Sequence, residues 1–435
     1  MDLKRTKIVA TLGPTSSSIE VIKEMYDKGL NVCRLNFSHG DHSIHEENIK
    51  RVKQVNDELG SNIAILADLQ GPKLRVGEMD GEGCEIKNGD KIIFTNKECI
   101  GTSEKVYMTY NNFAKDVNPG ELILIDDGKL AVRVESSNGL DEVVAIVEHG
   151  GVLKSKKGVN LPNTKISLPS LTEKDRKDLD YILTQDIEWI ALSFVRSTKD
   201  IIELRELIKA AGKNLKIIAK IEKPEAIDDI DGIVNETDAI MVARGDLGIE
   251  VPYQDVPLLQ KMMVKKCLKA SKPIIVATQM MESMIDGITP SRAEVNDVAN
   301  AVMDGADAVM LSGETSVGKH PGLVVETMSN IVKKVEEYDD IYNHNYLPIH
   351  REDRFISDNI CTSAVNLAES VNAKAIITMT VSGYTARKIS SRRSRAYTYV
   401  YTRNKAILNM LNLVWGVQAF YYDDSSSTDK NIDDI

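Results

Sequence analysis

The feature that most constrains the fold of this chain is a regular alternation of short apolar runs with longer segments of helical spacing. Eight apolar runs have the length of strands, and a helical segment follows each of them. Such units form either a closed barrel or an open doubly wound sheet. Eight units are the number that a (β/α)₈ TIM barrel needs. The sequence contains no GxGxxG segment, which makes the open sheet the less favoured alternative. We therefore predict a TIM barrel with strands within residues 6–14, 31–38, 62–70, 189–194, 216–222, 239–245, 273–279 and 308–312.

The alternation is interrupted after the third strand. From about residue 73 to residue 163, turn signals such as Asn88-Gly89-Asp90 separate short β-rich runs, which predicts a small all-β domain inserted in the barrel as a lid. Thr172 and Asp175 are spaced as a capping box where the helices resume. After the barrel, the pattern predicts a smaller α/β domain with helices at 357–371, 386–391 and 405–415, strands at 373–380 and 397–401, and an acidic tail at 423–435. The predicted domains are the barrel at 1–71 and 164–345, the lid at 72–163 and the C-terminal α/β domain at 346–435.

Composition excludes several classes of protein. A net charge of −11 offers no broad basic surface, so nucleic acid is not an expected partner. The 5 cysteines are scattered without CxxC spacing, which argues against a disulfide framework or a zinc site and suits a reducing cytoplasm. No apolar run of about 18 residues and no signal-peptide pattern occurs, so we expect no membrane association.

Polar side chains stand at the ends of nearly all the predicted strands. Lys220 and Glu222 are two residues apart and therefore share a strand face, where burial of charge is costly unless it is paired or bound to an ion. The simpler interpretation is a structural Lys–Glu pair. Barrel enzymes place their chemistry at these strand ends, and the whole set is difficult to explain by packing. The set comprises Arg34, Asn36, Ser38, Asp68, Ser193, Lys220, Glu222, Arg244, Asp246, Thr278 and Glu314.

The residue types indicate phosphoryl transfer. Glu222 and Asp246 are hard oxygen ligands that suit Mg²⁺ or Mn²⁺. Arg34, Lys220 and Arg75 supply positive charge for an anion, and the segment RGDLG at 244–248 is expected to open a short helix with free backbone N–H groups. Cations, a metal and oriented amides are the parts that phosphoryl transfer needs. The segment GETSVGK at 313–319 is not a P-loop, because His320 follows where a hydroxyl residue is required.

The sequence resembles the pyruvate kinase family over nearly all its length. The motifs that carry the resemblance are RLNFSHG (34–40), ADLQGPKLR (67–75), AKIEKPEA (219–226), MVARGDLGIEVP (241–252), ATQMMESM (277–284) and SRAEVNDVANAVMDGADAVMLSGET (291–315). The resemblance implies transfer of a phosphoryl group from phosphoenolpyruvate to ADP, giving pyruvate and ATP in glycolysis. It also implies a barrel, a lid and a C-terminal α/β domain.

The resemblance assigns roles by matching positions. Glu222 and Asp246 match the divalent-metal ligands, and Lys220 matches the lysine beside the transferring phosphoryl group. Thr278 matches a residue that assists proton delivery to the enolate, through a water relay because its hydroxyl is a weak acid. The implied catalytic residues are Lys220, Thr278 and Arg34. The implied substrate-binding set is Arg34, Ser193, Lys220, Gly245, Asp246 and Thr278, and the nucleotide-binding set is Arg34, His39, Arg75 and Lys174.

Two departures from the family pattern carry further expectations. Many members bind K⁺ through positions matching Asn36, Ser38, Asp68 and the carbonyl of Leu69, and have Thr at position 69 and Glu at position 73. Here Leu69 and Lys73 stand instead, so we expect K⁺ to be dispensable, with the ammonium of Lys73 supplying fixed charge. We also expect the C-terminal domain to lack the family's last strands, although TVSGYT at 380–385 resembles the loop that holds an effector phosphate. That loop offers Thr380, Ser382, Gly383 and Thr385 to a sugar phosphate or nucleotide monophosphate.

Two other functions remain as alternatives. A Schiff-base aldolase would also use a barrel lysine, but its lysine must lose its proton. A non-catalytic metabolite sensor built on the same fold would be expected to have lost some of Lys220, Glu222 and Asp246, and all three are present. The resemblance also implies a homotetramer.

Overall fold

The computed structural model describes residues 4–162, 164–342 and 354–423. Its centre is a closed barrel of parallel strands in the order β1-β17-β16-β15-β14-β13-β3-β2. Every strand lies within its predicted run, so the TIM barrel is confirmed. The strands are β1 (Lys7–Thr11), β2 (Val32–Asn36), β3 (Ala64–Asp68), β13 (Trp189–Leu192), β14 (Lys216–Ile221), β15 (Ala239–Ala243), β16 (Ile274–Ala277) and β17 (Ala308–Leu311).

The barrel is buried on both sides of its wall, and successive residues serve the two sides in turn. Val9, Leu66 and Met241 face the interior cluster, whereas their neighbours Ile8 and Ile65 join the layer between strands and helices. This is the period of two that a strand imposes, applied to a strand without a solvent face. The surrounding helices and turns are α1 (Ile19–Lys28), α2 (His42–Leu59), α4 (Glu173–Ile182), α5 (Thr198–Ala210), α6 (Pro224–Asp228), α7 (Ile230–Glu236), α8 (Arg244–Glu250), η1 (Tyr253–Asp255), α9 (Val256–Ala270), η2 (Glu282–Ile285), α10 (Arg292–Asp304), α11 (Gly313–Ser316), α12 (Pro321–Val335) and η3 (Asp339–Ile341).

Local sequence signals set several helix ends. Ser18 caps the start of α1 and Gly29 ends it in the left-handed region at φ 117°, which a side chain would oppose. The capping box at the start of α4 is confirmed, with Thr172 and Asp175 exchanging hydrogen bonds. The segment at 313–319, which has P-loop-like spacing, forms α11 and the turn before α12, whose first residue is Pro321.

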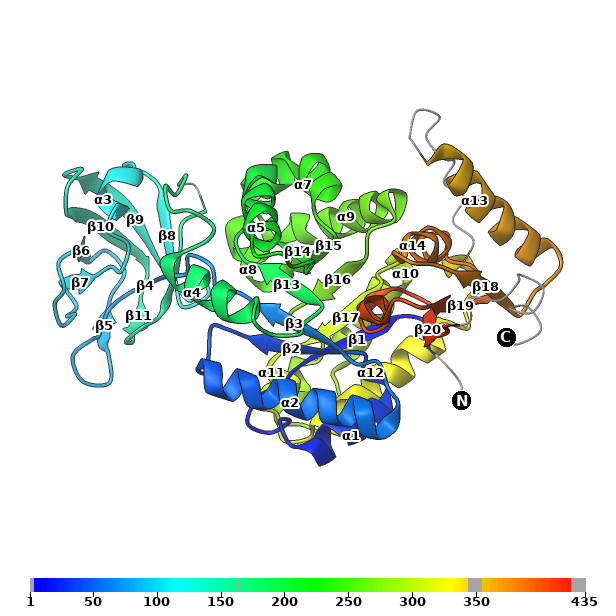
Figure 1. Cartoon of the computed structure of the whole chain (residues 1–435). Coiled ribbons are helices and arrows are strands. Elements are labelled where there is room, and N and C mark those ends of the chain that lie inside the picture. The colour runs from blue at the N-terminus through cyan, green and yellow to red at the C-terminus, as the bar shows by residue number, and fades with distance from the viewer. Residues whose placement is uncertain (1–3, 163, 343–353, 424–435) are drawn as a thin grey trace.

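The inserted domain has its own hydrophobic core and lies on the opposite side of the barrel from the C-terminal domain (Figure 1). Its main sheet has the order β4-β12-β8-β9-β10-β6-β7, and β11 pairs with β5. One short helix, α3 (Phe113–Asp116), accompanies the predicted β structure. The strands are β4 (Leu74–Arg75), β5 (Cys84–Ile86), β6 (Lys91–Thr95), β7 (Lys105–Tyr107), β8 (Leu122–Ile125), β9 (Leu130–Ser137), β10 (Glu142–His149), β11 (Gly151–Leu153) and β12 (Gly158–Asn160).

The C-terminal domain is a small parallel sheet with two helices, as predicted in outline. It contains α13 (Phe355–Ser370), β18 (Ala375–Met379), α14 (Tyr384–Ser390), β19 (Tyr397–Thr402) and β20 (Val417–Tyr421). The helix predicted at 405–415 is wrong. Two 3₁₀ turns stand there, η4 (Lys405–Ile407) and η5 (Met410–Leu413), and β20, which was not predicted, follows. The predicted boundary at 345/346 and the tail after residue 423 lie outside the described residues, as does residue 163 at the end of the insertion.

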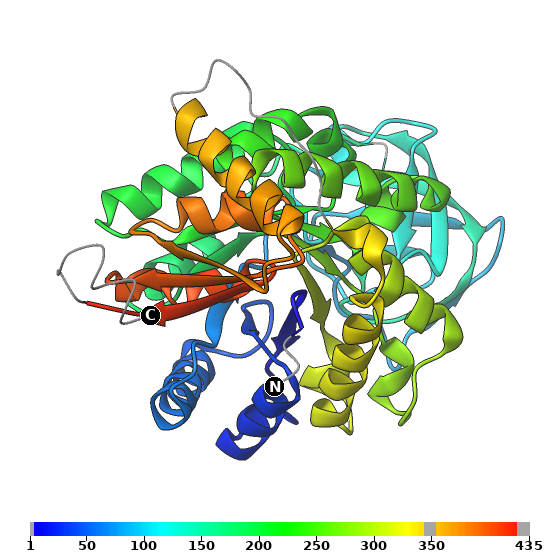
Figure 2. The ribbon, with the colours of Figure 1, turned by 90° about the vertical axis from the view of Figure 1, so that its right-hand side faces the viewer.

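Tertiary contacts explain why 405–415 is not a regular helix. Asn412 donates side-chain hydrogen bonds to the carbonyl oxygens of Asn31 (3.1 Å) and Asn62 (2.8 Å) in the barrel. Nearby, the ammonium of Lys7 donates to the carbonyl of Val417 at 2.8 Å. These contacts seat the C-terminal domain against the amino ends of the barrel strands, and Figure 2 shows its sheet in front of the barrel. The carboxyl ends are left to face the inserted domain. None of the described helices is both long and apolar enough to cross a membrane.

Candidate active site

The carboxyl ends of neighbouring barrel strands bring a compact group of charges together around Lys220. Its ammonium nitrogen lies 2.6 Å from Ser193 Oγ, 3.0 Å from Glu222 Oε1 and 3.3 Å from Asp68 Oδ1. Arg34 Nε donates to Asp68 Oδ2 at 2.7 Å. Five members of the predicted strand-end set are therefore brought together, and the Lys220–Glu222 ion pair offered as the simpler interpretation is part of this group.

The cluster holds its charges almost entirely away from water. The side chains of Asp68 and Glu222 are 1% exposed, and that of Lys220 is 12% exposed. Burial alone would lower the pKa of Lys220, but the carboxylates of Asp68 and Glu222 outweigh it and raise that pKa above its ordinary value. Burial would raise the pKa of Asp68, yet Lys220 and Arg34 hold it below its usual range. The ammonium and the Asp68 carboxylate thus stabilise each other in their charged forms.

The two predicted metal ligands differ in their protein contacts. Glu222 accepts the backbone N–H of Phe194 at 2.7 Å through Oε2, and burial together with Asp246 raises its pKa. Asp246, in the first turn of α8, has no hydrogen bond or ion pair for its carboxylate within the described ranges. A carboxylate that forms no direct ion pair, beside a buried second carboxylate, fits a hard divalent ion. In the described residues, no three His, Cys, Asp or Glu side chains are grouped as a metal site, so such an ion would need further ligands from substrate or water.

Thr278 lies at the end of β16 in a strained backbone. Its φ is 71° and that of Gln279 is 53°, and Phe194 at the end of β13 has φ 53°. Positive φ is rare for a β-branched residue, and such strain concentrates at functional sites. Thr278 Oγ1 accepts the backbone N–H of Gly245 at 2.8 Å. The N–H of Gly245, expected to be free in the RGDLG segment, therefore has a protein acceptor in the structure, and the role of Gly245 in substrate binding stays a prediction.

Arg244 supports this strained turn, and sequence reasoning gave it no role beyond its position. It forms a bidentate ion pair with Asp297 of α10 at 2.6 and 2.7 Å and donates to the carbonyl oxygen of Thr278 at 2.8 Å. The signal was available in the motifs, since both residues belong to them. Their pairing could not be read from spacing, because 53 residues separate them.

The predicted nucleotide-binding residues lie on three elements near β2. Lys174 of α4 donates to the carbonyl oxygen of Phe37 and to Asp178, both at 2.6 Å. Arg75 of β4 donates to the carbonyl oxygen of Lys156 at 2.9 Å. Burial lowers the pKa of His39, and the positive charges of Arg75, Lys73, Arg34 and Lys174 lower it further, so these cations surround one region.

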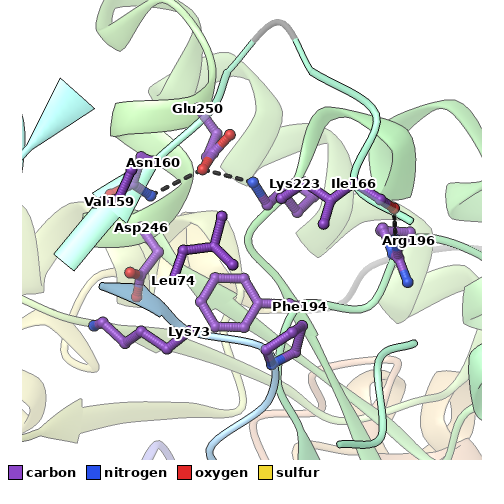
Figure 3. A pocket seen from close by; sticks show the side chains of 11 residues that line it. Lys73, Leu74, Val159, Asn160, Ile166, Phe194, Arg196, Lys223, Asp246 and Glu250 are labelled. Atoms are coloured by element: carbon purple, nitrogen blue, oxygen red, sulfur yellow. Dashed lines mark hydrogen bonds and ion pairs between the residues drawn. The ribbon is translucent and has the colours of Figure 1, made fainter. Parts of the chain in front are cut away.

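The predicted monovalent-ion set already has protein donors at three of its four positions. Asn36 Oδ1 accepts the N–H of Ser38 (3.1 Å), the Leu69 carbonyl accepts the Ser193 hydroxyl (2.7 Å), and Asp68 lies between Arg34 and Lys220. Lys73 lines the cleft that also contains Asp246 (Figure 3). It has no ion pair to any residue that the structure describes.

A trio of polar residues beside this cleft, two of them buried, was not predicted. Lys223 and Glu250 form an ion pair at 2.7 Å with side chains 7% and 1% exposed. Asn160 of β12 in the inserted domain donates to the same Glu250 oxygen at 2.8 Å, so the trio ties the insertion to α8 (Figure 3). Lys223 stands in the AKIEKPEA motif, but only tertiary structure reveals its partner.

The predicted effector loop follows β18 and leads into α14. Gly383 has φ 75°, and its N–H donates to Thr380 Oγ1 at 3.1 Å. Ser382 lies exposed, and Thr385 is half-buried in the first turn of α14. An effector role for this loop stays a prediction.

Comparison with known proteins agrees with the fold and the residues at its strand ends. The family model for the pyruvate kinase barrel domain matches residues 3–325, and that for the pyruvate kinase alpha/beta domain matches residues 358–435. The chain is 45% identical over 432 residues to a pyruvate kinase of Corynebacterium glutamicum, covering 99% of this chain and 90% of the relative. It is 42% identical over 435 residues to one of Geobacillus stearothermophilus, covering 99% and 74%. A solved pyruvate kinase structure from Cryptosporidium parvum superposes with a TM-score of 0.94 at 36% identity, covering 99% of this chain and 90% of that one. The chain belongs to the pyruvate kinase family, a family of glycolytic phosphotransferases.

Proposed function

We propose that in the pyruvate kinase reaction of this chain, phosphoenolpyruvate + ADP → pyruvate + ATP, the ammonium of Lys220 stabilises the phosphoryl group in transit. The observation that carries this role is a lysine kept charged in a dry site at the end of β14. Fixed positive charge in a site of low dielectric is worth more than in water and needs no reorganisation during the reaction. Arg34 and Ser193, which adjoin the same cluster, would contact the phosphoryl oxygens.

The same observation argues against a Schiff-base aldolase. An amine must be neutral to attack a carbonyl, and the carboxylates of Asp68 and Glu222 oppose deprotonation of Lys220. Borohydride reduction in the presence of pyruvate separates the two functions, since only the aldolase yields a covalent adduct on Lys220.

Glu222 and Asp246 would hold the Mg²⁺ or Mn²⁺ ion on which the family depends. Bound there, the ion would neutralise charge on the substrate oxygens. Glu222 is already oriented by the N–H of Phe194, and Asp246 has no competing ion pair among the residues described. The cations of Arg75 and Lys174 would take the phosphates of ADP, with His39 beside them, because these side chains gather near β2.

Thr278 would direct proton delivery to the enolate carbon. Its hydroxyl donates to the carbonyl of Ala277 at 2.5 Å and accepts from Gly245, so it is held in one orientation. A threonine hydroxyl is too weak an acid to be the source of the proton, and an ordered water chain would supply it. Thr278→Val should therefore slow formation of pyruvate more than it weakens phosphoenolpyruvate binding.

A lactate-dehydrogenase-coupled assay with phosphoenolpyruvate, ADP and Mg²⁺ tests the proposed roles. Turnover that is lost in Lys220→Met supports them. A purified, folded chain that binds phosphoenolpyruvate without turnover would instead indicate a metabolite sensor.

We also propose that catalysis needs no added K⁺. The support is the fixed charge of Lys73 in the cleft beside Asp246 and the protein donors already present at Asn36, Asp68 and Leu69. In a Mg²⁺ buffer free of K⁺, activity should be near its maximum, and Lys73→Glu should create a K⁺ requirement. Negligible activity that K⁺ restores in the unchanged protein contradicts the proposal.

Self-association into a homotetramer is supported by an apolar face on α13. Ile356, Ile360 and Leu367 are 76%, 64% and 63% exposed on this helix and line a shallow groove. An exposed apolar face of this kind marks an interaction site, and a second copy of the chain is the proposed occupant. Light scattering should give a smaller assembly for Ile360→Glu than for the unchanged chain.

A sugar phosphate or nucleotide monophosphate remains the proposed effector at 380–385. Calorimetric titration of the unchanged chain and of Ser382→Ala tests this proposal.

A further inference from the structure

A cavity of about 220 Å³ lies between the amino ends of the barrel strands and the C-terminal domain, far from the active-site ends. Its barrel wall is formed by the first residues of β13 and β14 and by the end of α9. Its other wall is formed by α14 and by η5. The cavity is large enough for a small metabolite, since one water occupies about 30 Å³ of liquid volume.

The walls of this cavity carry an excess of positive charge. Lys216, Lys272, Arg387 and Lys388 line it, against a single carboxylate, Asp238. The excess is unusual for a chain with a net charge of −11. Buried or half-buried charges are normally paired, so the partners of these groups decide whether the cavity is a site.

Two of the five charged groups are already paired with residues outside the cavity. Lys388 forms an ion pair with Asp358 at 2.9 Å. Asp238 receives Arg205 at 3.1 Å and the N–H of Ile217 at 3.0 Å. Asp238 still acts on Lys272 and Arg387 at longer range, but one carboxylate does not balance the cations that remain in the cavity.

The other three cations have no carboxylate partner in residues 4–162, 164–342 and 354–423. Lys272 donates to the carbonyl oxygen of Thr237 (2.6 Å), Lys216 donates to Asn214 Oδ1 (3.2 Å), and Arg387 reaches only the carbonyl oxygen of Ser382 at 3.4 Å. Burial lowers the pKa of Lys272; the charge of Asp238 opposes this, and the nearby charge of Arg387 lowers the pKa further. Burial likewise lowers the pKa of Arg387, again against the charge of Asp238. The two cations therefore lie close enough to repel each other in a poorly solvated place, and an anion between them would relieve both costs.

A further unsatisfied polar group lines the same cavity. Trp189 is 2% exposed, and its indole N–H has no hydrogen-bond partner within the described residues. Buried donors are usually paired, and the loss of a partner costs about 1–3 kcal/mol. A donor without an acceptor beside three unpaired cations calls for an acceptor-rich anion.

We propose that this cavity binds a phosphate group, either free or as the monoester of a small metabolite, between Lys272 of the barrel and Arg387 of the C-terminal domain. The cations come from β14, from the end of α9 and from α14, so they approach from different elements. A phosphoryl group offers negative charge and several acceptor oxygens on different sides, which matches that arrangement better than a planar carboxylate does. The site differs from the predicted effector loop, whose residues 380–385 precede Arg387, and from the active site at the other end of the barrel.

Calorimetric titration at constant ionic strength tests the site, with inorganic phosphate in one arm and ribose 5-phosphate in the other. Saturating phosphoenolpyruvate and Mg²⁺, without ADP, are present in both arms to fill the active site. We expect saturable binding that weakens about 10-fold or more in Arg387→Gln and in Lys216→Gln, since a charge-assisted hydrogen bond is lost in each. Lys213→Gln, which changes an exposed lysine close to Lys216 in the chain, is the matched control and should bind as the unchanged protein does.

The two arms identify the source of the phosphate, because tighter binding of ribose 5-phosphate indicates a monoester and equal binding indicates the free anion. Absence of saturable binding in both arms overturns the proposal. Binding that is unaffected by Arg387→Gln and Lys216→Gln, or that is abolished by Ser382→Ala alone, also overturns it, since the anion would then lie elsewhere.

Discussion

Replacement of Lys220 by Met is the sharpest test of the proposed chemistry, because it removes one charge and keeps most of the side-chain volume. The ammonium lies 3.0 Å from Glu222 and 3.3 Å from Asp68. At that separation and an effective dielectric constant of about 20, a unit charge pair is worth about 5 kcal/mol. Loss of one positioned electrostatic donor in a closed site typically costs about 3–4 kcal/mol of transition-state stabilisation. We therefore expect kcat to fall about 10²- to 10³-fold.

The same substitution should also destabilise the fold, so the two effects must be separated. Removal of one partner from a buried ion pair costs about 3–5 kcal/mol, and Arg34, which remains beside Asp68, should keep the loss near the lower value. Lys7→Met is the matched control. Lys7 is 1% exposed at the amino end of β1, on the side of the barrel away from Lys220, where it donates to the carbonyl oxygen of Val417. Its replacement should lower the free energy of unfolding without a comparable loss of kcat.

The assay is the coupled measurement of kcat at saturating substrate and Mg²⁺, with urea unfolding of each variant in parallel. A decrease in kcat of less than about 10-fold in Lys220→Met refutes the proposed role. An equal decrease in Lys7→Met would show that kcat reports stability rather than chemistry.

Three more predictions concern other buried charges. Glu222→Gln should raise the Mg²⁺ concentration for half-maximal activity at least about 10-fold in a Mg²⁺ titration, because even loss of a residue that only supports a metal ligand costs about that much affinity. An unchanged midpoint would exclude Glu222 as a metal ligand. Burial raises the pKa of Glu188 to about 7, so the folded state binds an extra proton and the free energy of unfolding falls as the pH rises from about 4.3 through 7. In urea unfolding, the stability of Glu188→Gln relative to the unchanged chain should therefore increase between pH 5 and pH 8. Arg393→Met should cost about 3–5 kcal/mol in the same experiment, because it leaves Asp307 unpaired at the interface between the barrel and the C-terminal domain, whereas Arg395→Met, at an exposed ion pair, should cost less than about 1 kcal/mol.

The barrel was predictable because each of its strands is short, apolar and separated from the next by a helix. All eight observed strands fall within the predicted runs, since these residues are buried on both sides and their pattern is continuous. The segment at 405–415 failed for the opposite reason. Its helical spacing is overridden by hydrogen bonds from Asn412 to the barrel, and a contact between residues 381 positions apart leaves no local signal.

In the candidate site too, features set by local sequence could be predicted, whereas contacts between distant residues could not. Strand ends point to one place in a barrel, so spacing sufficed to select Arg34, Lys220 and Asp246. Pairings across the site could not be read in this way. Glu250 and Asn160 are 90 residues apart and belong to different domains, yet they share a hydrogen bond that ties the insertion to the barrel.

The sequence also did not determine which groups Lys220 and Glu222 contact in the protein. Their spacing placed both side chains on one face, and the family resemblance assigned the phosphoryl group to the lysine and the metal ion to the carboxylate. In the protein alone they contact each other at 3.0 Å, and Asp68 takes a further share of the ammonium. A buried pair of this kind contributes little net stability, because desolvation offsets most of the attraction. Its value lies in keeping the ammonium of Lys220 charged and both side chains in place, so the structural ion pair and the proposed catalytic cluster are the same arrangement.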